Sequence, residues 1–197
     1  VLVHCAGALP AEAAFANVAG KVAGIGVMHP LRAIADGKRV MHELKGGVFG
    51  VEGDEEGRLR VGRLVQALNG TALPLERSQM PSYHAAAAIA SNLVVALLDT
   101  AVATLMSSGM DEQAATAALL PLALGALQNV ASTGVVAGLT GPVKRGDAET
   151  VARHLEAVEH VPGVAAVYQA LSRRAVAIAA RGGLPEADQR AVAAALE

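Results

Sequence analysis

Short hydrophobic runs alternate with amphipathic stretches over about the first 75 residues of the chain. Four of these runs favour β-strands, at positions 1–4, 24–28, 48–52 and 72–75. Between them, Ala11 to Val18 and Glu55 to Leu68 are suited to helices. This alternation predicts an α/β fold over residues 1–77. In such folds ligands are held by loops at strand ends, so we expect functional residues where the first two runs end.

From Pro81 onward strand-like runs are absent and residues typical of helix ends appear. Ser82 and Asp111 are suited to cap helices that end at Gly109 and near Gly134. Pro121, inside the second of these, predicts a kink. Three further helices are expected, over residues 147–159, 162–182 and 185–197. Residues 78–197 are therefore predicted to form an all-α helical domain with five helices.

Composition narrows the class of partner. Hydrophobic residues make up 53% of the chain, yet there are only two Phe, two Tyr and no Trp, which suits close packing of helices and not stacking on nucleobases. The formal charge of -2 gives no basic surface for nucleic acid or an anionic membrane. The longest apolar stretch, Ala85 to Leu98, contains Ser91 and Asn92, so we expect a buried helix and no membrane span.

Cysteine and histidine usage excludes other chemistry. Cys5 is the only cysteine, so an internal disulfide and a cysteine zinc site are ruled out, and a cytoplasmic location is expected. Of the six histidines, His42, His154 and His160 are isolated, and no pair has the i, i+4 spacing of a helical zinc site. We predict no metal.

The glycine pattern lacks the cradle that dinucleotide-binding folds use for the pyrophosphate. That cradle needs closely spaced glycines that open a helix. Gly24-Ile25-Gly26 lacks the third glycine and runs into His29 instead of a helix. The chain also starts directly on a strand without an initiator Met. We therefore expect that it is truncated, and that the first half of a Rossmann-type domain lies outside it.

A polar stripe marks the helix expected after Ser82. His84, Ser91, Asn92 and Asp99 fall within an arc of about 100° on one face of that helix. Such a stripe is either a hydrogen-bonded network in the core or the wall of a ligand pocket, and both interpretations stay open for His84. Asp99 would lie about 20 Å along the axis from His84, so we interpret it as structural.

Two polar turns complete the candidates. The loop from Thr140 to Asp147 carries Lys144 and Arg145, which either contact an anionic group of a cofactor or substrate or are simply solvated. Asp147 is expected to cap the next helix. The turn Glu52-Gly53-Asp54 is interpreted as a solvated lead into a helix rather than as a carboxylate cluster.

The motifs, in their order along the chain, resemble those of a known family. They are His4-Cys5-Ala6-Gly7-Ala8-Leu9, Met28-His29-Pro30-Leu31-Arg32-Ala33-Ile34, Val51-Glu52-Gly53-Asp54, Tyr83-His84-Ala85-Ala86-Ala87 through Ser91-Asn92, Leu120-Pro121-Leu122 with Asn129, and Leu139-Thr140-Gly141-Pro142 through Asp147 to His154-Leu155. The family is an uncharacterised bacterial group of Rossmann-like proteins with a C-terminal domain of unknown function, related to pyrroline-5-carboxylate reductase and prephenate dehydrogenase.

This resemblance implies an NAD(P)-dependent oxidoreductase that transfers a hydride to or from a small carbonyl or imine metabolite. The helical domain would be similar to the C-terminal domain of 6-phosphogluconate dehydrogenase and would form a homodimer. The cofactor would be NADP or NAD. The alternative is a non-catalytic module that dimerises and binds a metabolite, which the missing glycines favour.

The resemblance also implies roles for individual residues. His84 would donate or accept the proton, and Asn92 would orient the reacting oxygen or nitrogen. The cofactor would contact His4, Ala6 and Gly7. The substrate would contact His29, Ser91, Thr140 and Arg145.

Overall fold

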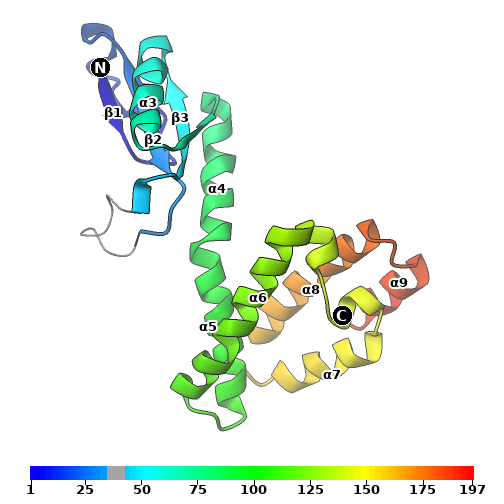
Figure 1. Ribbon diagram of the computed structural model, residues 1–197. Coiled ribbons are helices and arrows are strands. Elements are labelled where there is room, and N and C mark those ends of the chain that lie inside the picture. Colours follow the sequence, from blue (N-terminus) through cyan, green and yellow to red (C-terminus); the bar gives the residue numbers. More distant parts are fainter. Residues whose placement is uncertain (35–42) are drawn as a thin grey trace. The chain divides into compact units, whose positions relative to one another are not determined.

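Two compact units make up the part of the chain that the computed structural model describes, residues 1–34 and 43–197 (Figure 1). Internal contacts divide the chain into Val1–Leu93 and Val94–Glu197. The first unit contains a mixed β-sheet with helices and the second is helical, so the predicted fold class, α/β followed by all-α, is confirmed. The domain boundary placed at residue 77 stays a prediction. His42 lies outside the described residues.

The described strands form one sheet with the order β1-β2-β3-β4. Their bounds are Leu2–His4 for β1, Ile25–Pro30 for β2, Val48–Gly53 for β3 and Thr71–Pro74 for β4. Strands β1 and β2 are parallel, β2 and β3 antiparallel, and β3 and β4 parallel. All four predicted runs are therefore strands, and β2 extends past the prediction to include His29 and Pro30.

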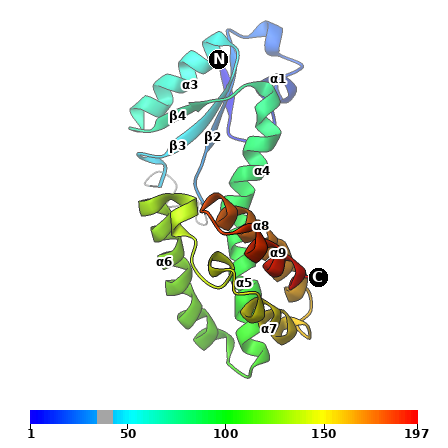
Figure 2. The ribbon, with the colours of Figure 1, turned by 90° about the vertical axis from the view of Figure 1, so that its right-hand side faces the viewer.

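Helices cover both faces of this sheet, and Figure 2 shows α3 and α1 on opposite sides. Helix α3 (Glu55–Ala67) buries Val61 and Val65 against Phe49 and Val51 of β3. On the other face, α1 (Ala11–Ala14), the short turn η1 (Ala19–Lys21) and the start of α4 (Met80–Ala90) pack on β2. Ile25 and Val27 of β2 belong to the apolar cluster on one face of the sheet, and Phe49 and Val51 of β3 belong to the cluster on the other face.

The start of α3 lies unusually close to β2. Asp54 caps the helix by accepting a hydrogen bond from the Gly57 amide at 2.7 Å, and it also accepts one from the Ile25 amide at 3.0 Å. A Cβ atom at Gly57 would lie 1.9 Å from the carbonyl oxygen of Ile25. Only glycine at position 57 lets the helix approach this strand so closely.

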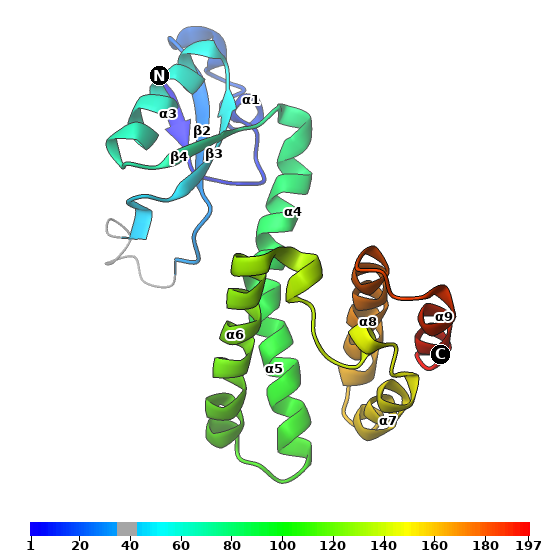
Figure 3. The same cartoon turned by 45° about the vertical axis from the view of Figure 1, so that its right-hand side comes forward.

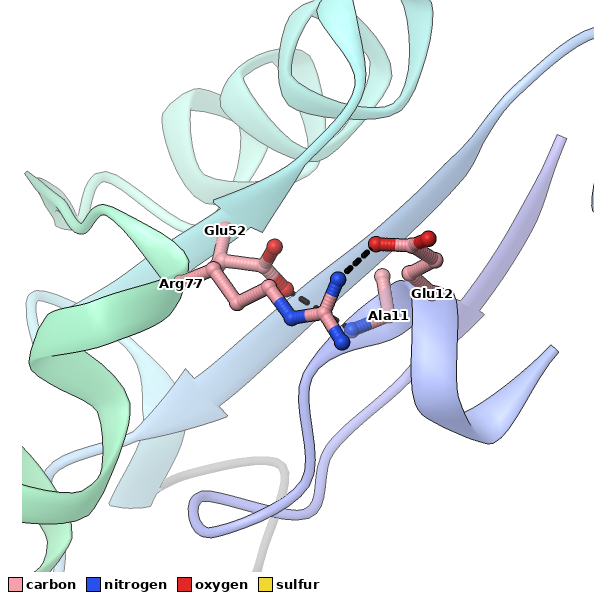
Figure 4. Close-up of polar contacts among 4 residues, drawn as sticks. All are labelled: Ala11, Glu12, Glu52 and Arg77. Atoms are coloured by element: carbon pink, nitrogen blue, oxygen red, sulfur yellow. Dashed lines mark hydrogen bonds and ion pairs between the residues drawn. The ribbon is translucent and has the colours of Figure 1, made fainter. Parts of the chain in front are cut away.

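Glu52 is buried, so the expected solvated turn at residues 52–54 is wrong for this residue. Its carboxylate accepts a hydrogen bond from the amide of Ala11 at 2.8 Å, as Figure 4 shows. Pro10, at the N-cap of α1, has no side chain that could make this bond. A residue 41 positions away in the sequence therefore caps α1, and the exposed ion pair between Glu12 and Arg77 lies beside it.

The long helix expected from Ser82 to Gly109 begins earlier and is interrupted. Glu76 and Gln79 form a reciprocal capping box ahead of α4, around the turn η2 (Arg77–Gln79), so Ser82 is not the cap. Helix α4 ends at Ala90, and α5 (Asn92–Ser107) follows after Ser91, whose backbone angles are not helical. The stretch is also largely exposed, so the buried helix expected over residues 85–98 is wrong.

The second unit contains most of α5 and four further helices (Figure 3). They are α6 (Glu112–Gly138), α7 (Ala148–Val158), α8 (Val164–Arg181) and α9 (Glu186–Ala194), with the turn η3 (Val143–Arg145) before α7. Asp111 and Asp147 accept hydrogen bonds from the amides of Ala114 and Thr150, as predicted for caps. Within α6 the backbone angles are non-helical at Gly134 and not at Pro121, where the sequence predicted a kink.

Helices α7, α8 and α9 enclose the core of the second unit. Val143, Val151, Val192 and Leu196 form its central apolar cluster. In contrast, α5 and α6 run antiparallel with few buried residues (Figure 3). Two stretches, Arg77–Ser107 and Glu112–Arg145, are long and apolar enough to cross a membrane by length and composition alone. In the most apolar window of each stretch, only 6% and 0% of the residues are buried.

Candidate functional site

A cavity of about 420 Å³ lies in the first unit, between the end of β2 and the junction of α4 with α5. Its polar lining residues are His29, Arg32, His84, Ser91 and Asn92. The other described lining residues are Pro30, Leu31 and alanines. The fold therefore brings together four residues singled out in the sequence, from two segments more than fifty positions apart. An apolar wall with a small number of polar groups is typical of ligand sites.

The imidazole of His29 is held by Tyr83, a residue to which the sequence analysis gave no role. The Nδ1 atom of His29 lies 2.7 Å from the hydroxyl oxygen of Tyr83, and that hydroxyl also lies 3.3 Å from the carbonyl oxygen of His29. The hydroxyl proton serves one of these two acceptors at a time. When it is donated to the carbonyl, Nδ1–H donates to Tyr83 and Nε2 is left as a free base.

Gly7 lies against the rings of His29 and His84. A Cβ atom at this position would lie 2.6 Å from Nε2 of His29 and 2.7 Å from Nδ1 of His84. The two rings have centroids 5.7 Å apart and meet edge to face. Their ring nitrogens therefore face the same point of the loop after β1, and residue 7 must lack a side chain for this contact to exist.

His4, at the end of β1, has one ring nitrogen engaged and one without a partner. Its Nδ1 accepts a hydrogen bond from the Ala6 amide at 3.1 Å, so the neutral ring carries its proton on Nε2. That Nε2 atom is buried and has no hydrogen-bond partner within the described residues, as is also true of Nδ1 of His84. The Ala6 amide thus already donates its hydrogen bond to His4, whereas Nε2–H of His4 is left to donate to another molecule.

Burial controls the ionisation of the groups around this loop. Burial lowers the pKa of His29, and the nearby charge of His84 lowers it further. Burial also lowers the pKa of His4, against the opposing attraction of Glu52. The Cys5 thiol has a raised pKa because of burial, which keeps it protonated and unsuited to nucleophilic attack. His4 and His29, whose pKa values are lowered, are therefore neutral at neutral pH.

The lowered pKa values of His4 and His29 predict a loss of stability on acidification. The unfolded chain takes up protons at both residues near their usual pKa of 6.5, whereas the folded protein takes them up at lower pH. The free energy of unfolding is therefore expected to fall as the pH drops below 6.5. Urea unfolding at a series of pH values measures this slope.

A flatter slope is expected for His29→Gln, because one of the two contributing groups is then missing. The variant His160→Gln changes an exposed ring of the second unit and should keep the wild-type slope. An unchanged slope in His29→Gln would contradict the depressed pKa of that residue.

Thr140 and Arg145 belong to the second unit. Thr140 is exposed, and Arg145 ends the turn η3 with an exposed side chain. Hydrogen bonds from Thr150, and to a lesser degree the charge of Arg145, lower the pKa of Asp147. The roles of Thr140 and Arg145 toward a substrate stay predictions.

A second cavity, of about 540 Å³, lies within the helical unit between α5, α7 and α8. Its wall is almost entirely apolar. His154, expected to be isolated, lies on this wall and pairs with the hydroxyl of Tyr168 at 3.0 Å. Although this cavity is larger than the first, the first is lined by more side chains that can exchange protons, so we take the first as the candidate site.

Over residues 1–34 and 43–197 no three His, Cys, Asp or Glu side chains are grouped as metal ligands.

Three residues of the site were not assigned a role from the sequence. They are Tyr83, Arg32 and Gly50, where a Cβ atom would lie within 3 Å of the Tyr83 ring. Tyr83 precedes His84 directly, and Arg32 follows the end of the second strand, so both belong to quoted motifs. The link between Gly50 and Tyr83 has no local signal, because it joins two distant segments.

A search for similar proteins identifies the family. Residues 47–175, more than half of the chain, match the domain of unknown function DUF2520. The chain belongs to this family. The DUF2520 match includes Tyr83, His84, Ser91 and Asn92 of the candidate site, and continues into the helical unit. No curated protein is significantly similar to the chain.

Two solved structures share the fold of this DUF2520 protein. Protein TM1727 from Thermotoga maritima is 29% identical with a TM-score of 0.78, over 93% of this chain and 70% of that one. Protein BF3122 from Bacteroides fragilis, named a "putative NADP oxidoreductase", is 22% identical with a TM-score of 0.70, over 89% of this chain and 65% of that one. The chain therefore shares its fold, an α/β unit followed by helices, with these two proteins.

Proposed function

We propose that this DUF2520 protein takes part in NAD(P)-dependent hydride transfer to or from a small carbonyl or imine compound. The observation that carries the proposal is the convergence of His29 and His84 on Gly7 at the edge of a cavity. Imidazole side chains beside a partly enclosed cavity suit proton exchange with a bound carbonyl or imine. The likeness in fold to BF3122 supports the same class of reaction.

When bound, a reduced nicotinamide would supply the hydride for the substrate carbon in the reductive direction. The substrate oxygen or nitrogen accepts a proton from His84, while Asn92 orients that atom from the same cavity wall. The reduced substrate would leave as the alcohol or amine. His29 and Tyr83, joined at 2.7 Å, lie beside His84, and the ring centroids of the two histidines are 5.7 Å apart.

The residues present fit the nicotinamide end of the cofactor. Nε2–H of His4 is a buried donor without a partner in the described part of the chain, and it suits the carboxamide oxygen of nicotinamide. The sequence contains no Gly-x-Gly-x-x-Gly cradle for the pyrophosphate. We therefore propose that residues outside this chain hold the phosphates, and that NADP or NAD binds the full-length protein.

Titration with NADPH and NADH tests this proposal. The full-length protein is expected to gain thermal stability with one of the two cofactors, because a ligand that binds only the folded state stabilises it. This chain by itself should respond far less, since it lacks the phosphate cradle. A full-length protein that responds to neither cofactor would contradict hydride transfer and favour a non-catalytic metabolite-binding module.

We propose a second copy of the chain as the partner of α5 and α6. Exposed large side chains cover this pair of helices, among them Val95 and Leu122, each 70% exposed, and Leu124 and Leu127. Surfaces of this kind in soluble proteins mark interfaces with other proteins. A membrane is the less favourable partner, because Asp99 in α5 and Asn129 in α6 would be costly in hydrocarbon.

The variant Leu122→Glu is expected to convert a dimer into a monomer, because a carboxylate on the apolar face would lose its hydration on association. Sedimentation equilibrium measures the mass of each form. The control Leu59→Glu alters a leucine of α3 that is 51% exposed, in the other unit, and should stay dimeric. A monomeric wild type, or one that floats with lipid vesicles, would contradict the dimer.

A further inference from the structure

Arg32 lies on the wall of the candidate cavity, two residues after β2 ends. Its Nε atom lies 3.4 Å from the place that a Cβ atom of the buried residue Gly47 would take. The absence of a side chain at Gly47 therefore leaves room for the arginine side chain beside the sheet. The residue is exposed, so its guanidinium group is accessible to a ligand that enters the cavity.

The described lining of the cavity has one fixed charge, and it is positive. Arg32 is the cation, and no Asp or Glu is among the described lining residues. The remaining polar groups, on His29, His84, Ser91 and Asn92, are all able to donate hydrogen bonds. A cavity with this lining favours an anionic group over a cation or a purely apolar ligand.

We propose that the cavity binds a small organic acid whose carboxylate is anchored by Arg32, while its carbonyl or imine group faces His84. The inference rests on the proposed hydride transfer and names the substrate class of the same site. Arginine suits this role because its planar guanidinium donates two parallel hydrogen bonds to a carboxylate. The volume of about 420 Å³ suits a small metabolite and is near the lower limit for ligand cavities.

His29 and Arg32 are three residues apart at the end of β2. An extended chain advances about 3.3 Å per residue, so their backbones are separated by at most about 10 Å. The long arginine side chain shortens the gap that the ligand must bridge. A carboxylate on Arg32 would therefore lie only a few bonds from a carbon that reacts beside the histidines, as in 2-oxo and 2-imino acids.

The test uses oxamate, an unreactive analogue of a 2-oxo acid, and oxamide, which has an uncharged amide in place of its carboxylate. Binding is followed by the NMR signal of the His29 ring during a pH titration, without cofactor. Oxamate is expected to raise the pKa of His29, because a nearby anion stabilises the imidazolium. Oxamide should leave that pKa where it is.

Arg32→Gln is expected to weaken oxamate binding at least about tenfold, which is the loss of about 1.4 kcal/mol. Arg32→Lys should recover part of the affinity, since the charge stays but the paired donors are lost. The matched control Arg63→Gln removes an exposed arginine of α3 and should bind oxamate like the wild type. A folded Arg32→Gln protein is recognised by unchanged NMR signals of Val61 and Val65, which lie in the core of the first unit.

The inference would be overturned by equal oxamate affinity in wild type and Arg32→Gln, by equal binding of oxamide and oxamate, or by no binding of oxamate at all. Inorganic phosphate is titrated in parallel, and affinity equal to that of oxamate would also overturn the assignment to a carboxylate. Binding of oxamate through Arg32 in a protein that transfers no hydride would leave this inference standing and reject the proposed reaction.

Discussion

The variant His84→Asn is expected to lower the turnover of the full-length protein by a factor of about 10²–10⁴. The cause is chemical: asparagine fills similar space and forms hydrogen bonds, but it exchanges no proton near neutral pH. His84 lies on the cavity wall and against Gly7, as His29 does, but the Nδ1 atom of His29 is engaged by Tyr83, whereas Nδ1 of His84 has no hydrogen-bond partner within the described residues. Steady-state kcat and the dissociation constant of the cofactor measure the two effects separately.

The cofactor affinity of His84→Asn should stay within about twofold of the wild type. A residue that transfers a proton only in the transition state does not contribute to binding of the cofactor in the ground state. His154→Asn is a matched control, since His154 pairs with Tyr168 in the second unit and is not among the described lining residues of the candidate cavity. Full activity in His84→Asn would remove this residue from the proton step and leave His29 as the candidate.

The variant Gly57→Ala is expected to lower the free energy of unfolding by about 2–3 kcal/mol. The added methyl would lie 1.9 Å from the carbonyl oxygen of Ile25, and that atom belongs to backbone, which does not move aside like a side chain. Helix α3 must then lift from β2, which weakens the apolar cluster around Val61 and Val65. Equilibrium unfolding in urea measures the loss.

Gly62→Ala, one turn and a half further along the same helix, should have the opposite sign. A Cβ atom at Gly62 meets nothing within 4 Å, so the helix gains the propensity of alanine, about 0.5–1 kcal/mol. Equal effects of the two substitutions would show that α3 is not seated on β2 at Gly57. Helix propensity alone predicts stabilisation in both, so the pair separates the local preference from the tertiary contact.

The chemistry of the candidate site was only partly visible in the sequence. His84, Ser91 and Asn92 stood out as a polar stripe on an apolar helix, and His29 stood out because a strand-like run ends there. All four line one cavity. Tyr83 did not stand out, since a tyrosine beside a histidine has no pattern of its own. Its partner is 54 positions earlier in the chain, and only the packing of α4 against the sheet creates the 2.7 Å contact.

Burial was the property that the sequence predicted least well. Glu52 was expected in solvent and is buried, because the amide of Ala11 needs an acceptor there. The apolar stretch of α4 and α5 was expected in a core and is exposed. The hydropathy of a segment indicates that its side chains are best buried, but it does not identify the surface that buries them. For α5 and α6 we propose that this surface belongs to a second copy of the chain.

Local interactions explain what the sequence determined by itself. The four strands, the caps Asp111 and Asp147, and the change from α/β to all-α texture depend on residues at most a few positions apart, so their patterns are readable. The antiparallel pairing of β2 with β3, the capping of α1 by Glu52 and the meeting of Gly7 with two histidines join distant segments. Only the tertiary structure decided these, because such contacts depend on how the whole chain closes and not on any window of it.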